Sequence, residues 1–367
     1  MLQKLKINRK VLRELDIITL LTLVTIVIFG SLNIGSISGI DQMKKQLIFL
    51  IIGLVIVYVT LLFDYSLLLN YTDIFYWLCI FFLILNDFTP LGHTVNGAQS
   101  WVKIGPIQFQ PSEFAKIAMI FMLGKKLQEM DGKINEPKNF FTLCFYAALP
   151  MLLIVIQPDM GMTMVSFFIV LGIFFAAGLD MRVILGGLGT LVVSVLVLWN
   201  TPIIKPYWKV RLLSFLNPTQ FSQSSTFQLV QSQISIGSGG LAGLGLFNAK
   251  QANFVPEART DFIFAVVGEQ FGLLGAIFLL VLYGVVIYRF IKIAQTSKDI
   301  FGSVITIGMT SVLLFSIFQN IGMTIGIMPV TGITLPLMSA GGSSLITNFM
   351  TFGLVLNIGM RRKKINF

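Results

Sequence analysis

Charged residues are scarce in this sequence. Asp, Glu, Lys and Arg together make up 11% of the 367 residues, whereas a soluble protein of this length carries about a quarter. Histidine occurs once, at His93, and both cysteines, Cys79 and Cys144, fall in apolar stretches. No CxxC pair, HExxH motif, nucleophile elbow or P-loop is present. These shortages exclude an ordinary soluble fold and argue against a disulfide framework, a zinc centre and a histidine-dependent triad.

Hydrophobic residues, in contrast, make up 55% of the chain and gather in ten long runs. A run of about 20 apolar residues crosses a hydrocarbon core about 30 Å thick, and backbone in lipid must satisfy its own hydrogen bonds, so such runs form helices. The expected spans are residues 15–36, 45–63, 71–88, 112–127, 140–157, 160–178, 182–200, 262–288, 300–327 and 341–360. We therefore predict an all-α polytopic membrane protein, with residues 1–367 as a single integral membrane domain.

The distribution of cations predicts the orientation of these spans. Most of the 26 Lys and Arg residues lie in segments that share one side of the membrane if both termini are cytoplasmic. A large extracellular loop, about residues 201–261, then connects the seventh and eighth spans. A loop of this length is seldom a plain connector. Within it, residues 227–237 predict a short amphipathic helix, and the glycine-rich residues 237–245 fit a flexible loop, close helix packing or a backbone nest for an anion.

Several cations remain on the outside and suit an anionic ligand there. They are Lys44, Lys45, Lys103, Lys205, Lys209, Arg211, Lys250 and Arg259. The net charge of +10 mainly reflects membrane topology. Because the sequence shows no cluster of basic residues that would form a patch on a soluble surface, we expect no nucleic-acid partner.

Ionisable residues at membrane depth are a second signal, because burying a charge in lipid costs several kcal/mol. Glu113 and Lys116 lie one helical turn apart at the start of the fourth span. They form either a mutually neutralising pair that pins the helix end or a polar wall of an outward-facing cavity. Asp159 stands at the outer start of the sixth span, where it either caps the helix or serves the same cavity.

Asp261 opens the eighth span from the outside. It again fits a helix cap, but Glu257 and Arg259 crowd beside it and Glu269 follows two turns into the same span. Loss of hydration at the edge of an apolar cavity would raise the pKa of the Asp261 carboxyl towards the range of a general base, and Arg259 would lower it. Both effects stay open at this point.

Four segments resemble the signatures of one known family. They are GAQSWVKIGPIQFQPSEFAK (97–116), QPDMG (157–161), FVPEARTDFIFAVVGEQFG (254–272) and MPVTGITLPLMSAGGSS (328–344). Their residues and their order along the chain are similar to those of the SEDS family (shape, elongation, division and sporulation), in particular its RodA-like branch. The resemblance covers nearly the whole chain. Two positions depart from the family pattern: Arg259 stands where His is frequent, and Ala340 where Tyr is usual.

The resemblance implies a multi-pass protein of the bacterial plasma membrane. Its expected activity is a peptidoglycan glycosyltransferase that polymerises lipid II into β-1,4 glycan strands on the outer face, for cell elongation and shape. It implies Asp261 as the catalytic residue, and places Glu113, Lys116 and Asp159 in two further family motifs. The expected partners are a class B penicillin-binding protein, the undecaprenyl-pyrophosphate-linked glycan and membrane lipid.

Chemistry at the outer face needs no ATP, because lipid II carries its own pyrophosphate leaving group. No cofactor is required by the sequence, although a divalent cation, Mg²⁺ or Mn²⁺, could bridge the pyrophosphate and a carboxylate. Substrate binding is expected from Glu113, Lys116, Asp159, Arg259, Lys103, Lys205, Lys209 and Arg211. Two other classes remain open: a lipid II flippase, suggested by the intramembrane charges, and a non-enzymatic scaffold for the penicillin-binding protein.

Overall fold

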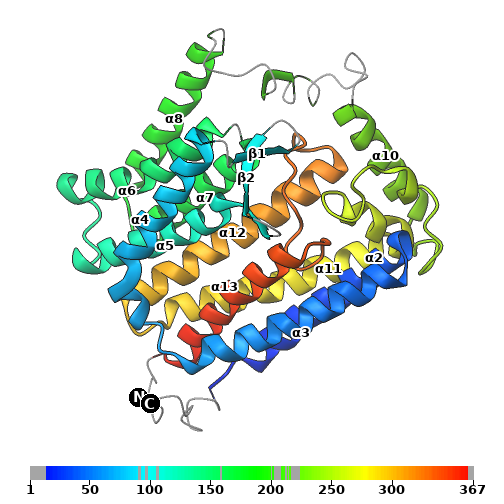
Figure 1. Cartoon of the computed structure of the whole chain (residues 1–367), viewed down its shortest axis with the longest axis horizontal. Coiled ribbons are helices and arrows are strands. Elements are labelled where there is room, and N and C mark those ends of the chain that lie inside the picture. Colours follow the sequence, from blue (N-terminus) through cyan, green and yellow to red (C-terminus); the bar gives the residue numbers. More distant parts are fainter. Residues whose placement is uncertain are drawn as a thin grey trace. The chain divides into compact units, whose positions relative to one another are not determined.

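The computed structural model describes residues 14–89, 92–95, 98–104, 107–157, 159–199, 201, 208–210, 213, 215 and 224–362 (Figure 1). The chain divides into two compact units. Unit 1 comprises Met1–Leu62, Pro206–Arg289 and Leu313–Leu356, and unit 2 comprises Phe63–Lys205, Phe290–Val312 and Asn357–Phe367. Each unit is described separately below.

All ten apolar runs are helical, which confirms the expected fold class. They form α2 (Ile17–Ser38), α3 (Ile40–Leu62), α4 (Leu67–Phe88), α5 (Pro111–Glu129), α6 (Pro137–Ile156), α7 (Met160–Ala176), α8 (Met181–Leu198), α11 (Ile263–Gln295), α12 (Ile300–Ile325) and α13 (Gly342–Met360). Eight of these helices are long and apolar enough to cross a membrane. The exceptions are α7, which is shorter, and α5, which carries several charges. Ten spans and cytoplasmic termini therefore stay predictions.

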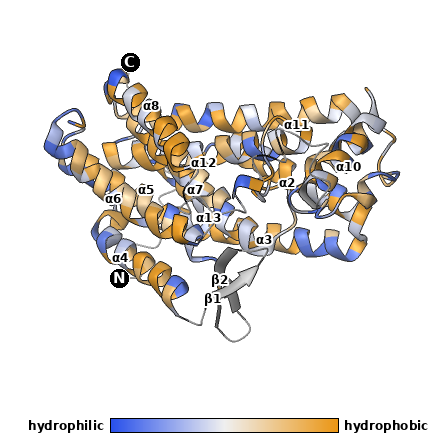
Figure 2. Ribbon diagram, turned by 90° about the horizontal axis from the view of Figure 1, so that it is seen from above, coloured by the Kyte–Doolittle hydropathy of each residue, from blue (hydrophilic) through white to orange (hydrophobic). Residues whose placement is uncertain are grey.

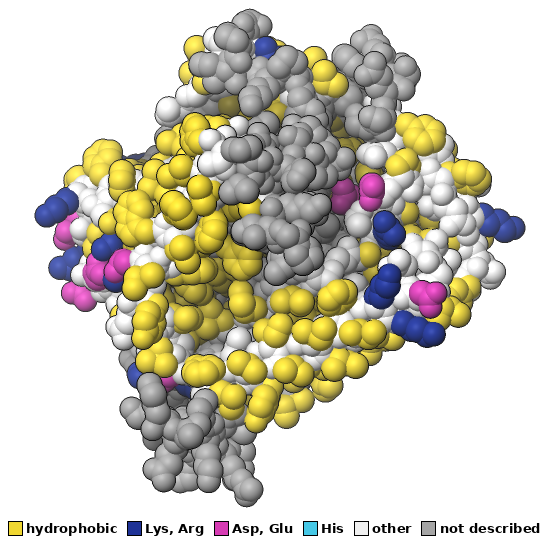
Figure 3. Space-filling view, in the orientation of Figure 1, with side chains coloured by type: hydrophobic (Ala, Val, Ile, Leu, Met, Phe, Trp, Pro, Cys, Tyr) yellow, Lys and Arg dark blue, Asp and Glu magenta, His cyan; other side chains and the backbone are white. Residues whose placement is uncertain are grey.

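The surface agrees with a lipid environment. Hydrophobic residues dominate the bodies of the helices and hydrophilic ones gather near their ends (Figure 2). In the space-filling view, hydrophobic side chains cover much of the face that is coloured (Figure 3). An exposed face of this composition is stable only against lipid.

Unit 1 is held together by aromatic and glycine contacts between its helices. Phe29 of α2 packs against Phe271 and Phe278 of α11, with ring centroids 4.9 and 5.6 Å apart. Gly53 of α3 lies so close to α13 that a Cβ there would approach the ring of Phe349 to 2.2 Å. Small residues of this kind let membrane helices approach closely.

The eighth apolar run is interrupted in the structure. Gly272 of α11 adopts φ 60° and ψ −157°, which breaks the helix. The segment that follows α10 (Ser224–Gly239) fills the break: the N–H groups of residues 244 and 245 donate to the carbonyls of residues 269 and 270, and those of residues 273 and 274 donate to the carbonyls of residues 240 and 241. Every freed backbone group in lipid needs such a partner. A Cβ at Gly243 would lie 2.2 Å from the Gln270 carbonyl oxygen, so close packing against α11 accounts for the glycine at this position.

Helix α10 confirms the short helix expected in the outer loop. The residues between α4 and α5, for which the sequence predicts no strand, form an antiparallel sheet of β1 (Gly92–Val95), β2 (Ala98–Ile104) and β3 (Ile107–Phe109), in that order. Gly92 and Phe109 both pair with Val102 of the central strand. The sheet belongs to unit 2, whose core includes Leu83, Ala115 and Ile154 of α4, α5 and α6.

Candidate active site

A strained turn presents Asp261 at the start of α11. Glu257 adopts φ 54°, a left-handed conformation that costs a non-glycine residue about 1–3 kcal/mol. Its carbonyl oxygen accepts the N–H groups of Thr260, Asp261 and Phe262 at 3.1, 3.1 and 3.2 Å. Phe262 and Ile263 are fully buried, while the Asp261 side chain is partly exposed. The turn therefore anchors the apolar start of the helix and leaves the carboxylate accessible.

One buried side chain fixes the backbone of Asp261. Asn320 of α12 is 0% exposed, and its Nδ2 donates to the carbonyl oxygens of Asp261 and Ile333, both at 2.7 Å. The neighbouring Gln319 donates to the carbonyl of Pro329 at 2.8 Å. The side-chain amides of Gln319 and Asn320 thus both connect α12 to the loop between α12 and α13. Of the two, Asn320 also bonds the backbone of Asp261.

A second set of bonds holds the residues before Asp261. Ser339 Oγ donates to the Thr260 carbonyl at 2.6 Å and accepts the Leu335 N–H at 2.8 Å. The N–H of Ala340 donates to the Arg259 carbonyl at 2.8 Å. Because this bond uses the backbone of Ala340, its departure from the family's Tyr leaves the contact intact.

Gly332 lies directly beside the catalytic candidate. It adopts φ +76°, and a Cβ there would stand 3.5 Å from Asp261 Oδ2. Only glycine occupies this conformation without strain. The position therefore keeps one side of the carboxylate open.

Glu269 organises the preceding part of the loop. The side chain is 0% exposed, and Oε1 accepts the N–H groups of Lys250 and Gln251 at 2.7 and 2.8 Å. Oε2 accepts the N–H of Ala252 at 2.6 Å and the hydroxyl of Ser235 at 3.0 Å. A buried carboxylate is stable when charge-assisted bonds of this number satisfy it. Glu269 thereby fixes residues 250–252.

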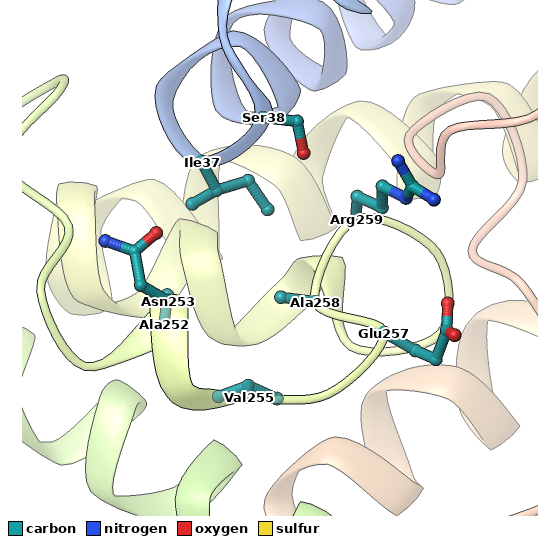
Figure 4. A pocket seen from close by; sticks show the side chains of 8 residues that line it. All are labelled: Ile37, Ser38, Ala252, Asn253, Val255, Glu257, Ala258 and Arg259. Carbon is teal, nitrogen blue, oxygen red and sulfur yellow. The ribbon is translucent and has the colours of Figure 1, made fainter.

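A pocket of about 270 Å³ opens on the loop that Glu269 and Ser339 hold at its two ends. One wall comes from the end of α2 and the other from the loop itself (Figure 4). Its lining residues are Ile37, Ser38, Ala252, Asn253, Val255, Glu257, Ala258 and Arg259. Arg259, a predicted site residue, thus lines a cavity, two residues before Asp261.

Three other predicted residues lie together in unit 2. Lys116 Nζ and Glu113 Oε2 form an ion pair at 2.8 Å on α5. Asp159 caps α7 by accepting the N–H of Met162 at 2.9 Å, and its other oxygen accepts Gln110 Nε2 at 2.8 Å. Both structural interpretations, pairing and capping, are therefore realised. Gln110, the residue before α5, joins the two features.

The structure describes only some of the remaining cations that were predicted to bind substrate. Lys209 is half-buried in a helical segment at 208–210, and Lys103 belongs to β2. Lys205 and Arg211, like the side chain of Lys103, lie outside the described residues. Sequence reasoning missed Asn320, Gln319 and Ser339. The last of these lies in a family motif that was recognised without a role for each residue.

Comparison with known proteins agrees with this picture. The family model of the FtsW, RodA and SpoVE cell cycle proteins matches residues 7–364. The peptidoglycan glycosyltransferase MrdB of Escherichia coli K12 is 35% identical over 359 residues, covering 96% of this chain and 95% of its own. Stage V sporulation protein E of Bacillus subtilis is 36% identical over 319 residues, covering 86% of each chain.

Solved structures are similar over nearly the same length. A chain from a peptidoglycan synthase complex, described as coordinating polymerization and crosslinking, has a TM-score of 0.82 at 30% identity and covers 94% of this chain and 97% of its own. The rod shape determining protein RodA of Thermus thermophilus has a TM-score of 0.72 at 28% identity, covering 95% and 98%. An aspartate-to-alanine mutant of that RodA matches with the same TM-score at 27% identity.

Proposed function

The chain belongs to the FtsW, RodA and SpoVE family of cell cycle proteins, and on that basis we propose that it is a peptidoglycan glycosyltransferase that polymerises lipid II into β-1,4-linked glycan strands. The reaction takes place at the outer face of the bacterial plasma membrane. The E. coli relative carries this enzyme name. Because the motif sequences resemble those of RodA, we propose that the activity serves cell elongation and shape.

The observation that carries the proposal is the presentation of Asp261. Asn320 and the strained turn at Glu257 hold its backbone, the two residues that follow it are buried, and Gly332 leaves room beside Oδ2. A carboxylate fixed in this way loses little freedom when it acts, and correct positioning contributes several kcal/mol to a rate.

Asp261 serves as the general base. It takes the proton from the 4-hydroxyl of the acceptor sugar as that oxygen attacks C1 of the donor sugar. The bond between C1 and the pyrophosphate oxygen breaks, and the lipid pyrophosphate leaves with the electron pair. Displacement with inversion converts the α-linked lipid sugar into a β-1,4 bond. General-base assistance of this kind contributes about 10²–10⁴-fold to the rate.

Several charged residues besides Asp261 are proposed to bind the substrate. They are Lys116, which pairs with Glu113, and Asp159 and Arg259. Lys103, Lys205, Lys209 and Arg211 are proposed to stabilise the departing pyrophosphate. Among the described residues no three metal-binding side chains gather, so Mg²⁺ or Mn²⁺ would take most ligands from the substrate and water, and one from Asp261.

We further propose that the protein works with a class B penicillin-binding protein. The similar chain from a peptidoglycan synthase complex supports such an assembly, because that complex is described as coordinating polymerization and crosslinking. The partner would cross-link the strands that this protein makes.

Purified protein, alone and with its partner, should convert lipid II into a ladder of glycan strands on a denaturing gel. An established polymerase under the same conditions is the control. If neither preparation gives polymer while the control polymerase does, the proposed glycosyltransferase activity is refuted. Movement of lipid II across a vesicle membrane without polymer would instead identify a flippase. Normal cell shape in cells whose protein shows neither polymerisation nor lipid II movement would identify a scaffold.

A further inference from the structure

The pocket of about 270 Å³ beside the Asp261 turn is a distinct feature of unit 1. We propose that it is a sugar-binding subsite, which holds one N-acetylated pyranose ring of the glycan substrate while Asp261 acts on the neighbouring ring. This assignment rests on the proposed function and adds the substrate part that the pocket recognises.

The position of the pocket suits this role. Glu257, Ala258 and Arg259 line it and belong to the same hydrogen-bonded turn as Asp261, whose N–H donates to the Glu257 carbonyl at 3.1 Å. The opposite wall is the last turn of α2, with Ile37 and Ser38 (Figure 4). A ring in the pocket is therefore adjacent to a ring at the carboxylate, as two successive sugars of a strand would be.

The lining has the chemistry that a sugar needs. Glu257 only accepts hydrogen bonds, Arg259 only donates them, and Ser38 does both, which matches hydroxyl groups that act in both ways. Val255 and Ala258 are buried, so the accessible lining is mainly polar, which suits the hydroxyl groups of a sugar. The volume lies just below the range of about 300–1,000 Å³ that is typical of small-molecule sites, so one ring fits better than a longer ligand.

Both charged side chains are available to a ligand. Among the described residues, neither Glu257 nor Arg259 takes part in an ion pair. Glu257 Oε2 accepts one bond, from the Thr260 hydroxyl at 3.0 Å. The lining therefore includes two oppositely charged residues that do not pair with each other, and such a pair can orient a polar ligand.

The walls are fixed before any ligand arrives. Glu269 holds residues 250–252 through three backbone N–H groups, and Ala340 holds the carbonyl of Arg259. Because the loop is ordered in advance, binding does not have to order it, which increases affinity. The anchors at the two ends are separate, so changes in the pocket leave the backbone of Asp261 in place.

The test is steady-state polymerisation of lipid II by Arg259→Gln and Ser38→Ala, which alter opposite walls. Loss of a charged hydrogen bond should raise KM about 10-fold for Arg259→Gln, and loss of a neutral one about 3-fold for Ser38→Ala, with kcat unchanged. Lys133→Gln is the control for the loss of a positive charge: Lys133 is exposed, does not line the pocket and is not among the proposed substrate-binding residues. A KM for both variants equal to that of the control would overturn the proposal.

Binding provides a readout that does not depend on activity. The soluble disaccharide of N-acetylglucosamine and N-acetylmuramic acid, without lipid or peptide, should bind the Asp261→Asn protein, and Arg259→Gln on that background should weaken it about 10-fold. Competition by the free stem peptide instead of the disaccharide would overturn the sugar assignment. If wild-type protein makes no polymer yet the disaccharide binds with this dependence, the proposed function fails and the subsite stands.

Discussion

Replacement of Asn320 by Ala should uncouple Asp261 from the helix that holds it. The substitution removes two hydrogen bonds, one to the buried Ile333 carbonyl and one to the partly buried Asp261 carbonyl. The first loss costs about 1–3 kcal/mol and the second about 0.5–1.5 kcal/mol, so the free energy of unfolding falls by about 1.5–4.5 kcal/mol. The larger effect is expected on catalysis, because a shift of about 1 Å in a catalytic group costs about 100-fold in rate.

The assay is kcat for lipid II polymerisation by protein that remains folded in detergent, measured beside its thermal unfolding. Gln319→Ala is the matched control, because Gln319 is the adjacent residue, is equally buried and bonds a carbonyl of the same loop without touching Asp261. We expect both variants to lose stability and only Asn320→Ala to lose about 100-fold in kcat. An equal loss in the two variants, or a kcat within two-fold of wild type for Asn320→Ala, would refute the reasoning.

Three further changes have distinct expected results. Gly332→Ala forces a side chain into a left-handed conformation at a cost of about 1 kcal/mol or more and places a methyl 3.5 Å from Asp261 Oδ2; kcat should fall while KM is kept, and an unchanged rate would show that the carboxylate has room to spare. Glu269→Gln replaces an acceptor oxygen with a donor that faces backbone N–H groups, so KM for lipid II should rise more than kcat falls, and the reverse split would contradict its link to the pocket. Burial opposes ionisation of Asp64, but bonds from Ser66 and the charges of Arg361 and Lys298 outweigh it and hold the pKa of the Asp64 carboxyl below 3.8. Its contribution to stability is therefore present above about pH 3.8 and lost as pH falls through the lower folded-state pKa, so acid should lower the thermal midpoint of wild-type protein more than that of Asp64→Asn.

The helices were predictable because each one depends on local composition. All ten apolar runs became helices with boundaries shifted by a few residues, since lipid leaves an apolar backbone no other choice. The interruption of α11 at Gly272 was not predicted. Its partners lie about 30 residues earlier in the chain, and periodicity within one segment carries no information about such a distant contact.

The small sheet was missed for a different reason. Its strands have three to seven residues, which is too short for a clear alternating pattern. The dipeptide Asn-Gly at positions 96–97, which lies between the first two strands in the sequence, is a hairpin signal and could have indicated it.

The candidate site divides in the same way. Asp261, Glu113 and Lys116 were singled out by their charge at membrane depth, because a charge there is costly and stands out in the sequence, and the catalytic role of Asp261 came from the family resemblance. Asn320 and Ser339 were not, because their role depends on carbonyl oxygens 59 and 79 residues away. Neutral polar residues in apolar helices have many uses, and only the folded chain shows which one applies.

The most direct test of the account compares the initial rates of lipid II polymerisation by wild-type protein, Asp261→Asn and Asp41→Asn. Asp41 is an exposed carboxylate in the first turn of α3 and serves as the control for loss of an outward negative charge. The account predicts that Asp261→Asn slows polymerisation by about 10²–10⁴-fold in protein that unfolds at the wild-type temperature, while Asp41→Asn keeps the wild-type rate. Polymerisation by Asp261→Asn at the wild-type rate would contradict the central claim.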